Sequence, residues 1–197
     1  MSEKYKFVDK HGVYFVTPTL VGWVDLFTKK QYIDIILDSL RFCQKEKGLV
    51  IHAWVVMSSH LHLIISSNKN NLSDIMRDFK TYTSKQLIQE LLHGNDSRKE
   101  WMVELFRQAA TPIKRVNGYK VWQDGNHPVL LDSNQKFNDR LNYLHNNPVE
   151  QIWLIIRSTT GIRAPEITWV VKDYSQQIFW SEESHALKAH QKRRTGQ

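Results

Sequence analysis

Apolar side chains recur every three or four residues in several stretches of the chain, which is the spacing of a helix with one buried face. The clearest stretch runs from Lys30 to Lys47, and Gly48 ends its pattern. The last stretch stops before Pro148, because the residue preceding a proline avoids helical geometry. The pattern predicts helices over residues 30–47, 72–92, 98–109 and 134–146.

Shorter apolar runs bounded by polar residues predict β-strands. Leu49–Met57 and Leu61–Ile65 are joined by almost no linker, which is typical of a tight antiparallel hairpin. Val13–Val24 is rich in β-branched and aromatic residues and predicts a strand bent at Pro18, and Val129–Leu131 predicts a short one. The resulting order, β-α-β-β-α-α-β-α, predicts an α+β domain with an antiparallel sheet.

The composition is sufficient for a hydrophobic core and gives the chain a positive net charge. Of the 197 residues 41% are hydrophobic, which is enough for one domain of ordinary size. The formal net charge is +7. A basic balance favours an anionic partner, nucleic acid first, although a basic protein without such a partner is the alternative.

The single cysteine, Cys43, excludes a disulfide framework and a thiolate zinc site, and its apolar surroundings predict a buried side chain. The first nine residues are polar and charged rather than a signal peptide. No apolar run approaches the ~18 residues of a membrane span. We therefore expect a protein of the reducing cytoplasm without a membrane partner.

Candidate chemistry begins with His60-Leu61-His62. Side chains two positions apart on a strand share one face, so both imidazoles project together while Leu61 points into the core. Two neutral imidazoles placed in this way make half of a divalent metal site. Two solvated histidines at a hairpin edge are the alternative.

Tyr143 lies beside the apolar stripe of the predicted helix 134–146. A tyrosine there is usually a packing residue with a solvated hydroxyl, but a phenolate can also attack phosphorus and form a phosphotyrosine. Asn147 follows one helical turn later, where its amide oxygen is either a third metal ligand or a helix cap before Pro148.

Three segments together resemble the single-tyrosine HUH transposases, which are IS200-like, and within them the REP-associated tyrosine transposases: Tyr5–Val16, AWVVMSSHLHLIIS and YLHNNPV. That family carries a His-hydrophobic-His motif on a central strand and its nucleophile in a helix that runs into Asn-Pro-Val. The Trp122-Gln123 pair is similar to a segment between the two motifs. The resemblance covers roughly residues 5 to 150, which we take as one domain, 1–150.

The resemblance implies a ferredoxin-like core that binds single-stranded or hairpin DNA. It implies that His60, His62 and a polar group of the tyrosine helix, which maps to Asn147, hold Mg²⁺ or Mn²⁺ as a Lewis acid. It implies that Tyr143 attacks the DNA, giving a 5′-phosphotyrosine that is later rejoined to a 3′-hydroxyl. Relatives occur as monomers and as homodimers with shared sites, so both states stay open.

Further DNA contacts follow from the same resemblance, because the helix after the histidine hairpin borders the DNA groove in relatives. We expect Lys80, Ser84 and Lys85 to contact phosphates, with a solvated basic face as the alternative. Trp122 is a candidate for base stacking, and His127 for a DNA contact or proton transfer.

Two departures from the family are visible. Ser58-Ser59 stands where many relatives have Pro-Asn, which changes the hairpin but not the ligands. Residues 151–197 lack the expected Asp-Tyr…Tyr-Ser-Ser-Ala run, yet codons allowed for Arg157–Trp169 can spell a similar run in a neighbouring frame. We therefore hypothesise a frameshift between Glu150 and Arg157, which would make 151–197 an atypical, partly disordered segment.

Three other interpretations stay open. A basic ferredoxin-like domain can bind single-stranded nucleic acid without catalysis. A metal-dependent nuclease would use activated water in place of Tyr143. A degenerate relic would bind metal and fail to cleave.

Overall fold

The computed structural model describes residues 7–111 and 118–146 of the chain, without the side chains of residues 145 and 146. Its strands are β1 (Tyr14–Val16), β2 (Leu49–Val56), β3 (Leu61–Ser67) and β4 (Val129–Leu130). Its α-helices are α1 (Lys30–Lys47), α2 (Leu72–His93), α3 (Lys99–Ala110) and α4 (Asn134–Asn146). The strands form one antiparallel sheet in the order β2-β3-β1-β4, the ferredoxin-like arrangement, so the expected α+β fold class is confirmed.

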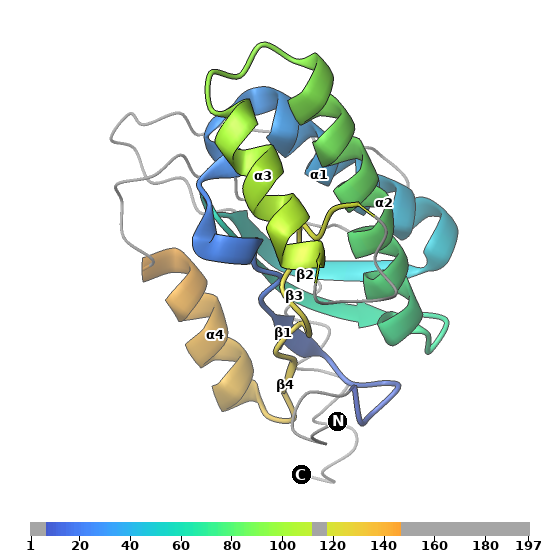
Figure 1. Cartoon of the computed structure of the whole chain (residues 1–197). Helices are drawn as coiled ribbons and strands as arrows, with labels where there is room; N and C mark the ends of the chain where they lie inside the picture. Colours follow the sequence, from blue (N-terminus) through green and yellow to red (C-terminus); the bar gives the residue numbers. More distant parts are fainter. Residues whose placement is uncertain (1–6, 112–117, 147–197) are drawn as a thin grey trace, which may run out of the picture.

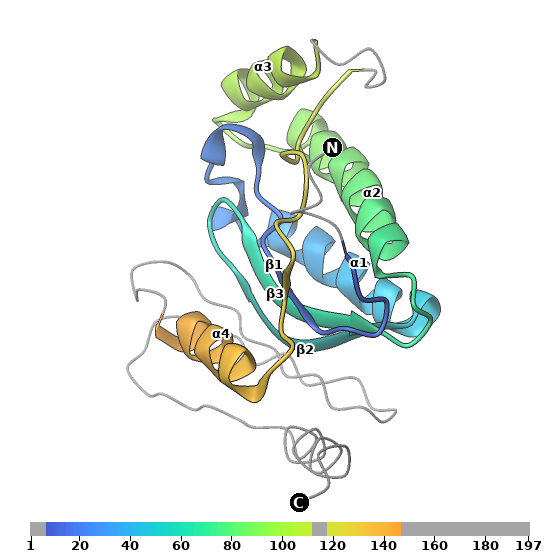
Figure 2. The same ribbon diagram turned by 90° about the horizontal axis from the view of Figure 1, so that it is seen from below.

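Helices cover both faces of this sheet, with α1 and α2 on one face and α4 on the other (Figures 1 and 2). The alternation of side chains along β3 explains the division. Leu61, Leu63 and Ile65 belong to the large core under α1 and α2, whereas Ile64 belongs to a smaller cluster under α4. His62 has the parity of Ile64, and the histidine pair therefore faces α4.

The smaller cluster determines where α4 lies. Leu144 of α4 packs with Phe15 of β1 and with Val55 and Ile64 of the hairpin, and Leu141 is half-buried against them. Tyr143 lies beside this apolar stripe and is 45% exposed. Packing of Leu144 on the sheet therefore holds Tyr143 near the strand that carries His62.

α1 begins and ends at the predicted residues because its termination is local. Gly48 adopts a left-handed conformation with φ of 77°, and its N–H donates to the Cys43 carbonyl in the last turn. The conformation costs glycine no steric clash. Cys43 itself is buried in the core, as expected.

The strand predicted over Val13–Val24 is wrong beyond Val16. Pro18 has no N–H for a ladder, and after it only isolated bridges remain, Thr19 with His60 and Leu20 with Trp122. A 3₁₀ turn, η2 (Val21–Trp23), follows, and η3 (Leu26–Thr28) leads into α1. The chain thus folds over the histidine hairpin instead of extending the sheet.

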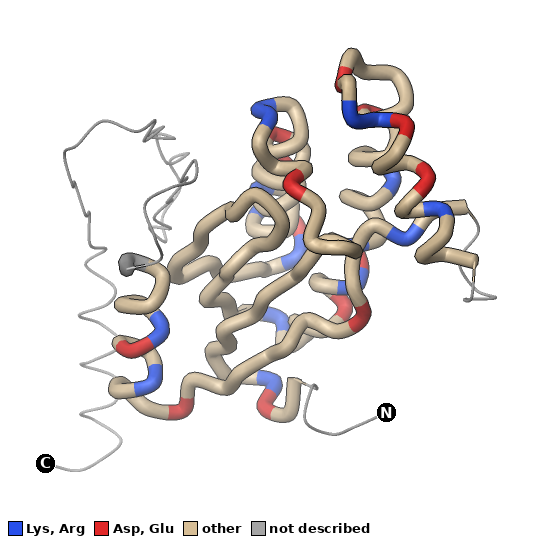
Figure 3. Tube along the Cα trace, turned by 60° about the vertical axis from the view of Figure 1, so that its left-hand side comes forward, with Lys and Arg blue, Asp and Glu red and all other residues tan. Residues whose placement is uncertain are grey.

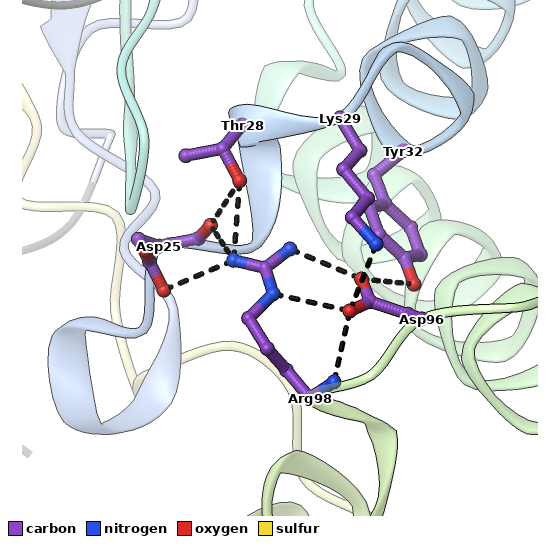
Figure 4. Close-up of polar contacts among 6 residues, drawn as sticks. All are labelled: Asp25, Thr28, Lys29, Tyr32, Asp96 and Arg98. Atoms are coloured by element: carbon purple, nitrogen blue, oxygen red, sulfur yellow. Dashed lines mark hydrogen bonds and ion pairs between the residues drawn. The ribbon is translucent and has the colours of Figure 1, made fainter.

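A buried carboxylate joins the α2–α3 connection to the start of α1 (Figure 4). The Asp96 side chain accepts hydrogen bonds from Tyr32 and Arg98 and forms an ion pair with Lys29 at 3.0 Å. Arg98 also reaches Asp25 at 3.2 Å. Hydrogen bonds to the Asp96 carboxylate hold its pKa well below its usual range. The Arg98 guanidinium has the largest effect, and the Arg98 N–H, Lys29 and Tyr32 add smaller ones.

Charged residues lie on the helices and loops, since the strands contain none (Figure 3). The sheet is therefore an apolar support, and the polar groups that interrupt it on the α4 face are mainly histidines. No helix in the described ranges is long and apolar enough to cross a bilayer.

Candidate active site on the α4 face of the sheet

His60 and His62 point their Nε2 atoms at each other across 3.2 Å. His62 belongs to β3. His60 immediately precedes this strand and is held by the bridge to Thr19. The hairpin turn is closed by the Met57 N–H, which donates to the His60 carbonyl. The predicted convergence of the two rings on one face is thus a consequence of strand parity.

Both imidazoles are neutral at ordinary pH. Burial lowers the pKa of His60. Burial also lowers the pKa of His62 to about 3, followed by the repulsion that a protonated His60 and Arg140 would exert on a charged His62 ring. A neutral imidazole has a nitrogen lone pair available for a metal ion, whereas an imidazolium has none. His62 is only 4% exposed, so the alternative of two solvated surface histidines does not describe it.

Hydroxyl groups lie behind each ring. Thr17 Oγ1 lies 3.1 Å from Nδ1 of His62, and Ser59 Oγ lies 3.1 Å from Nδ1 of His60. If each Nδ1 carries the proton and donates it to the hydroxyl, both Nε2 lone pairs face the space between the rings. Such outer contacts fix the tautomer and orientation of metal-binding histidines.

The pair fits a divalent ion. Two nitrogen ligands about 2.1 Å from one ion lie about 3.0–3.4 Å from each other for angles between octahedral and tetrahedral, and the observed separation is 3.2 Å. Among the described residues no third His, Cys, Asp or Glu joins them. The third ligand expected from the family resemblance, Asn147, lies outside the described residues.

Tyr143 lies next to this pair. Its ring centroid is 5.3 Å from that of His62, and 6.1 Å from that of Phe15, with edge-to-face geometry in both cases. Phe15 also stacks on His62 at 5.2 Å. The phenol predicted as a nucleophile and the two imidazoles predicted as ligands, from elements about eighty positions apart, thus meet on one face.

Arg140 adds a cation to the same place. Its guanidinium carbon lies 5.1 Å from the Phe15 ring centroid and 6.0 Å from that of Tyr143. No carboxylate of residues 7–111 or 118–146 forms an ion pair with it, whereas Lys136 one turn earlier pairs with Asp132. Arg140 could not be predicted from the sequence, because a single arginine on an exposed helix has no distinctive spacing.

Comparison with known proteins bears on what this arrangement does. Residues 24–147 match the family described as Transposase IS200 like. The matched range includes the histidine hairpin and Tyr143. The chain belongs to the IS200-like transposase family. No curated protein matches it.

The fold of this transposase is similar to that of a solved REP-associated tyrosine transposase bound to a REP hairpin. The two share 18% sequence identity with a TM-score of 0.52, over 76% of this chain and 74% of the other. At this identity the likeness concerns the fold. The similar fold agrees with the ferredoxin-like core that the family resemblance implies.

The basic residues expected to contact DNA differ in their surroundings. Lys80 of the transposase donates hydrogen bonds to the Gln123 and Gly125 carbonyls at 2.6 and 2.7 Å. Burial lowers the pKa of Lys80 to about 8. Ser84 is half-buried and donates to the Lys80 carbonyl, whereas Lys85 is exposed. Of the three, Lys85 is the one with a free approach for a phosphate.

The structure corrects the expectation for Trp122. Its side chain is 4% exposed, its indole N–H donates to Thr83 Oγ1, and its ring lies between Phe27 and Phe79. A buried indole has no open face on which a base can stack, so Trp122 is a core residue that ties the 121–125 segment to α2. His127 is exposed, with a φ of 46°.

Proposed function

We propose that this transposase cleaves and rejoins single-stranded or hairpin DNA through a phosphotyrosine on Tyr143, with His60, His62 and Asn147 as the ligands of Mg²⁺ or Mn²⁺. One observation carries the proposal: two neutral imidazoles 3.2 Å apart lie against a half-exposed phenol. Family membership supports a DNA-processing enzyme, and the geometry supports the residues that perform the chemistry.

The reaction is a transfer between oxygens at phosphorus. The Tyr143 oxygen bonds to the scissile phosphorus and the phosphorus–O3′ bond breaks, which leaves a 5′-phosphotyrosine and a 3′-hydroxyl. The phenol loses its proton to solvent and the departing oxygen gains one. Attack by another 3′-hydroxyl reverses the step and joins strands, so no external energy source is consumed.

The bound divalent ion would polarise the phosphate and stabilise the leaving oxygen as a Lewis acid. The chain's own groups do the rest. Thr17 and Ser59 orient the imidazoles, Phe15 holds the His62 ring, and the Arg140 guanidinium is available for a phosphate oxygen beside Tyr143. A guanidinium with no competing carboxylate binds phosphate through two parallel hydrogen bonds.

The experiment is a covalent-adduct assay with the full chain. Hairpin oligonucleotides with single-stranded flanks and a 3′-end label are incubated with Mn²⁺ and run on a denaturing gel. The wild type should give a protein-linked band, and Tyr143→Phe should give none while binding the DNA with unchanged affinity. Tyr82→Phe, which alters an exposed tyrosine of α2, is the matched control and should form the adduct.

Other outcomes separate the alternatives. Cleavage that persists in Tyr143→Phe and disappears in His60→Ala identifies a nuclease that uses water. Binding without cleavage or adduct, on every hairpin tested, identifies a binding module or a relic. An adduct that reappears on mixing Tyr143→Phe with His60→Ala identifies a homodimer in which each tyrosine serves the partner's histidines.

A further inference from the structure

Trp23 lies beside His60 of the histidine pair. Its indole centroid is 5.4 Å from that of His60, with the two rings at 72°. The side chain is nevertheless 60% exposed, among the most exposed of the large apolar side chains described. A wide aromatic surface is thus presented to solvent directly beside the candidate metal ligands.

The loop that carries Trp23 is fastened to the histidine hairpin. On one side the Leu20 N–H donates to the Ser59 carbonyl, and on the other the Phe27 N–H donates to the Ser58 carbonyl, both at 2.9 Å. Leu20 and Phe27 are themselves buried. The position of Trp23 relative to His60 is therefore fixed from both ends of the loop.

The backbone at this point is unusual for a large side chain. Gly22 and Trp23 have φ values of 66° and 56°, which places two consecutive residues in the left-handed region. Glycine adopts this conformation readily, but a tryptophan there is strained. The surrounding structure holds Trp23 in this strained conformation, in which the indole points outward. The side chains of neighbouring Val24 and Leu26 are buried instead.

We propose that Trp23 is a stacking surface for a nucleobase of single-stranded DNA next to the scissile phosphate. Aromatic side chains stack on unpaired bases of any sequence, because every base has a π-face. A strand whose phosphate reaches His60, His62 and Tyr143 passes the indole at the His60 edge of the site. The inference rests on the proposed function for the identity of the ligand, and it assigns a base subsite that the phosphate chemistry does not require.

A competing role is shielding of His60, in which the indole only restricts the imidazole. The two roles differ in what they affect. Shielding acts through metal binding, so its loss would leave DNA affinity unchanged when metal is removed. Stacking acts on the DNA directly, so its loss would lower DNA affinity even without metal. The loss would also abolish the effect of removing the base at one nucleotide position.

The test measures DNA affinity in EDTA, with the full chain in a Tyr143→Phe background that prevents cleavage. The probe is a hairpin oligonucleotide with a single-stranded flank, carrying one abasic site moved along the flank. The parent protein should lose roughly ten- to a hundredfold in affinity when one position is abasic. Trp23→Ala should lose a similar factor on intact DNA and should no longer respond to that abasic site, while Trp23→Phe should keep part of both effects.

Two variants make the result interpretable. Phe42→Ala removes an aromatic side chain that is 54% exposed on α1, across the sheet from the histidine pair, and should change nothing. Trp23→Gly suits the left-handed backbone, so it should fold at least as well as the parent and still lose affinity.

Equal affinities for the parent and Trp23→Gly, or an abasic response that persists in Trp23→Gly, would overturn the inference. Adduct formation by Tyr143 is measured separately. A stacking response without any adduct would therefore leave Trp23 as a base-binding residue and reject only the strand-transfer chemistry.

Discussion

The hydroxyl of Thr17 and the Nδ1 atom of His62 lie 3.1 Å apart, which links the end of β1 to β3. Thr17 immediately follows β1, which pairs with β3, so the contact is set by the β1–β3 register, Val16 opposite Leu63. The opposite nitrogen of the same ring faces His60. A hydroxyl that accepts a hydrogen bond from Nδ1–H leaves the Nε2 lone pair of His62 directed toward the proposed metal position.

Thr17→Val tests this contact, because valine has nearly the shape of threonine without the hydroxyl. We expect the affinity for Mn²⁺ to fall about ten- to a hundredfold, the usual effect of removing an outer partner of a metal-bound histidine. Titration of the full chain with Mn²⁺, followed by isothermal calorimetry, measures the change.

Ser66→Ala is the matched control for that variant. It removes a hydroxyl that lies 2.9 Å from Nε2 of His52, a histidine of the same hairpin that is not part of the pair. Its Mn²⁺ affinity should equal that of the wild type. If Thr17→Val binds Mn²⁺ as tightly as Ser66→Ala, Thr17 has no part in orienting His62.

Arg140→Ala should slow adduct formation more than it weakens DNA binding. The guanidinium lies over Phe15 and beside Tyr143, and the described chain gives it no carboxylate partner. A cation that stabilises charge at phosphorus contributes mostly in the transition state, so we expect a single-turnover rate about a hundredfold lower. The rate of appearance of the protein-linked band, at saturating protein, measures it.

Lys136→Ala, one turn earlier on α4, is the comparison for Arg140. Its ammonium pairs with Asp132 at 2.8 Å, whereas the cation over the Tyr143 ring is Arg140, so loss of Lys136 should change the rate less than about twofold. Similar rates of adduct formation for Arg140→Ala and Lys136→Ala would show that the position of the Arg140 charge beside Tyr143 does not contribute to the reaction.

Much of this fold could be predicted from the sequence, because its elements are defined locally. The apolar period of Lys30–Lys47 and the glycine after it fix α1 without reference to the rest of the chain. Strand parity alone places His60 and His62 on one face. The proximity of Tyr143 required the family resemblance, since nothing in α4 alone says which face of the sheet it covers.

The remaining features depend on contacts between distant segments. The burial of Trp122 could not be predicted, because the sequence around an isolated tryptophan in a loop does not distinguish a core residue from a candidate for base stacking. The carbonyls that hold Lys80 come from residues more than forty positions later. The exposed position of Trp23 depends on a left-handed turn at Gly22 and Trp23, which a strand predicted over Val13–Val24 does not contain. Gly22 is the sequence signal for that turn.

Lys85 and Lys80 should differ in their effect on the salt dependence of DNA binding. Exposed Lys85 is free to neutralise a phosphate, so Lys85→Ala should reduce the slope of log affinity against log salt by about 1. Lys80→Met should instead lower stability, because Lys80 ties α2 to the 123–125 carbonyls, and should leave the slope near the wild-type value. Binding titrations at several salt concentrations, beside urea unfolding, separate the two effects.

Asp96→Asn should destabilise the fold by about 3 kcal/mol at neutral pH, because it leaves the Lys29 and Arg98 charges without their buried partner. Urea unfolding measures the loss. Asp34→Asn is the control: Asp34 forms an exposed ion pair with Lys30 one turn away, and such pairs contribute about 0.5 kcal/mol.

The pH dependence of this difference follows from the direction of the pKa shift. The fold holds the pKa of Asp96 below its unfolded value of about 3.9, so the carboxylate stabilises the folded state fully above that pH. As the pH falls below about 4, the unfolded state gains a proton that the folded state does not, and the contribution declines. The gap between the wild type and Asp96→Asn should therefore be constant from pH 7 to about pH 5 and should narrow below pH 4. A gap that stays unchanged down to pH 3 would mean that Asp96 contributes through packing rather than through its charge.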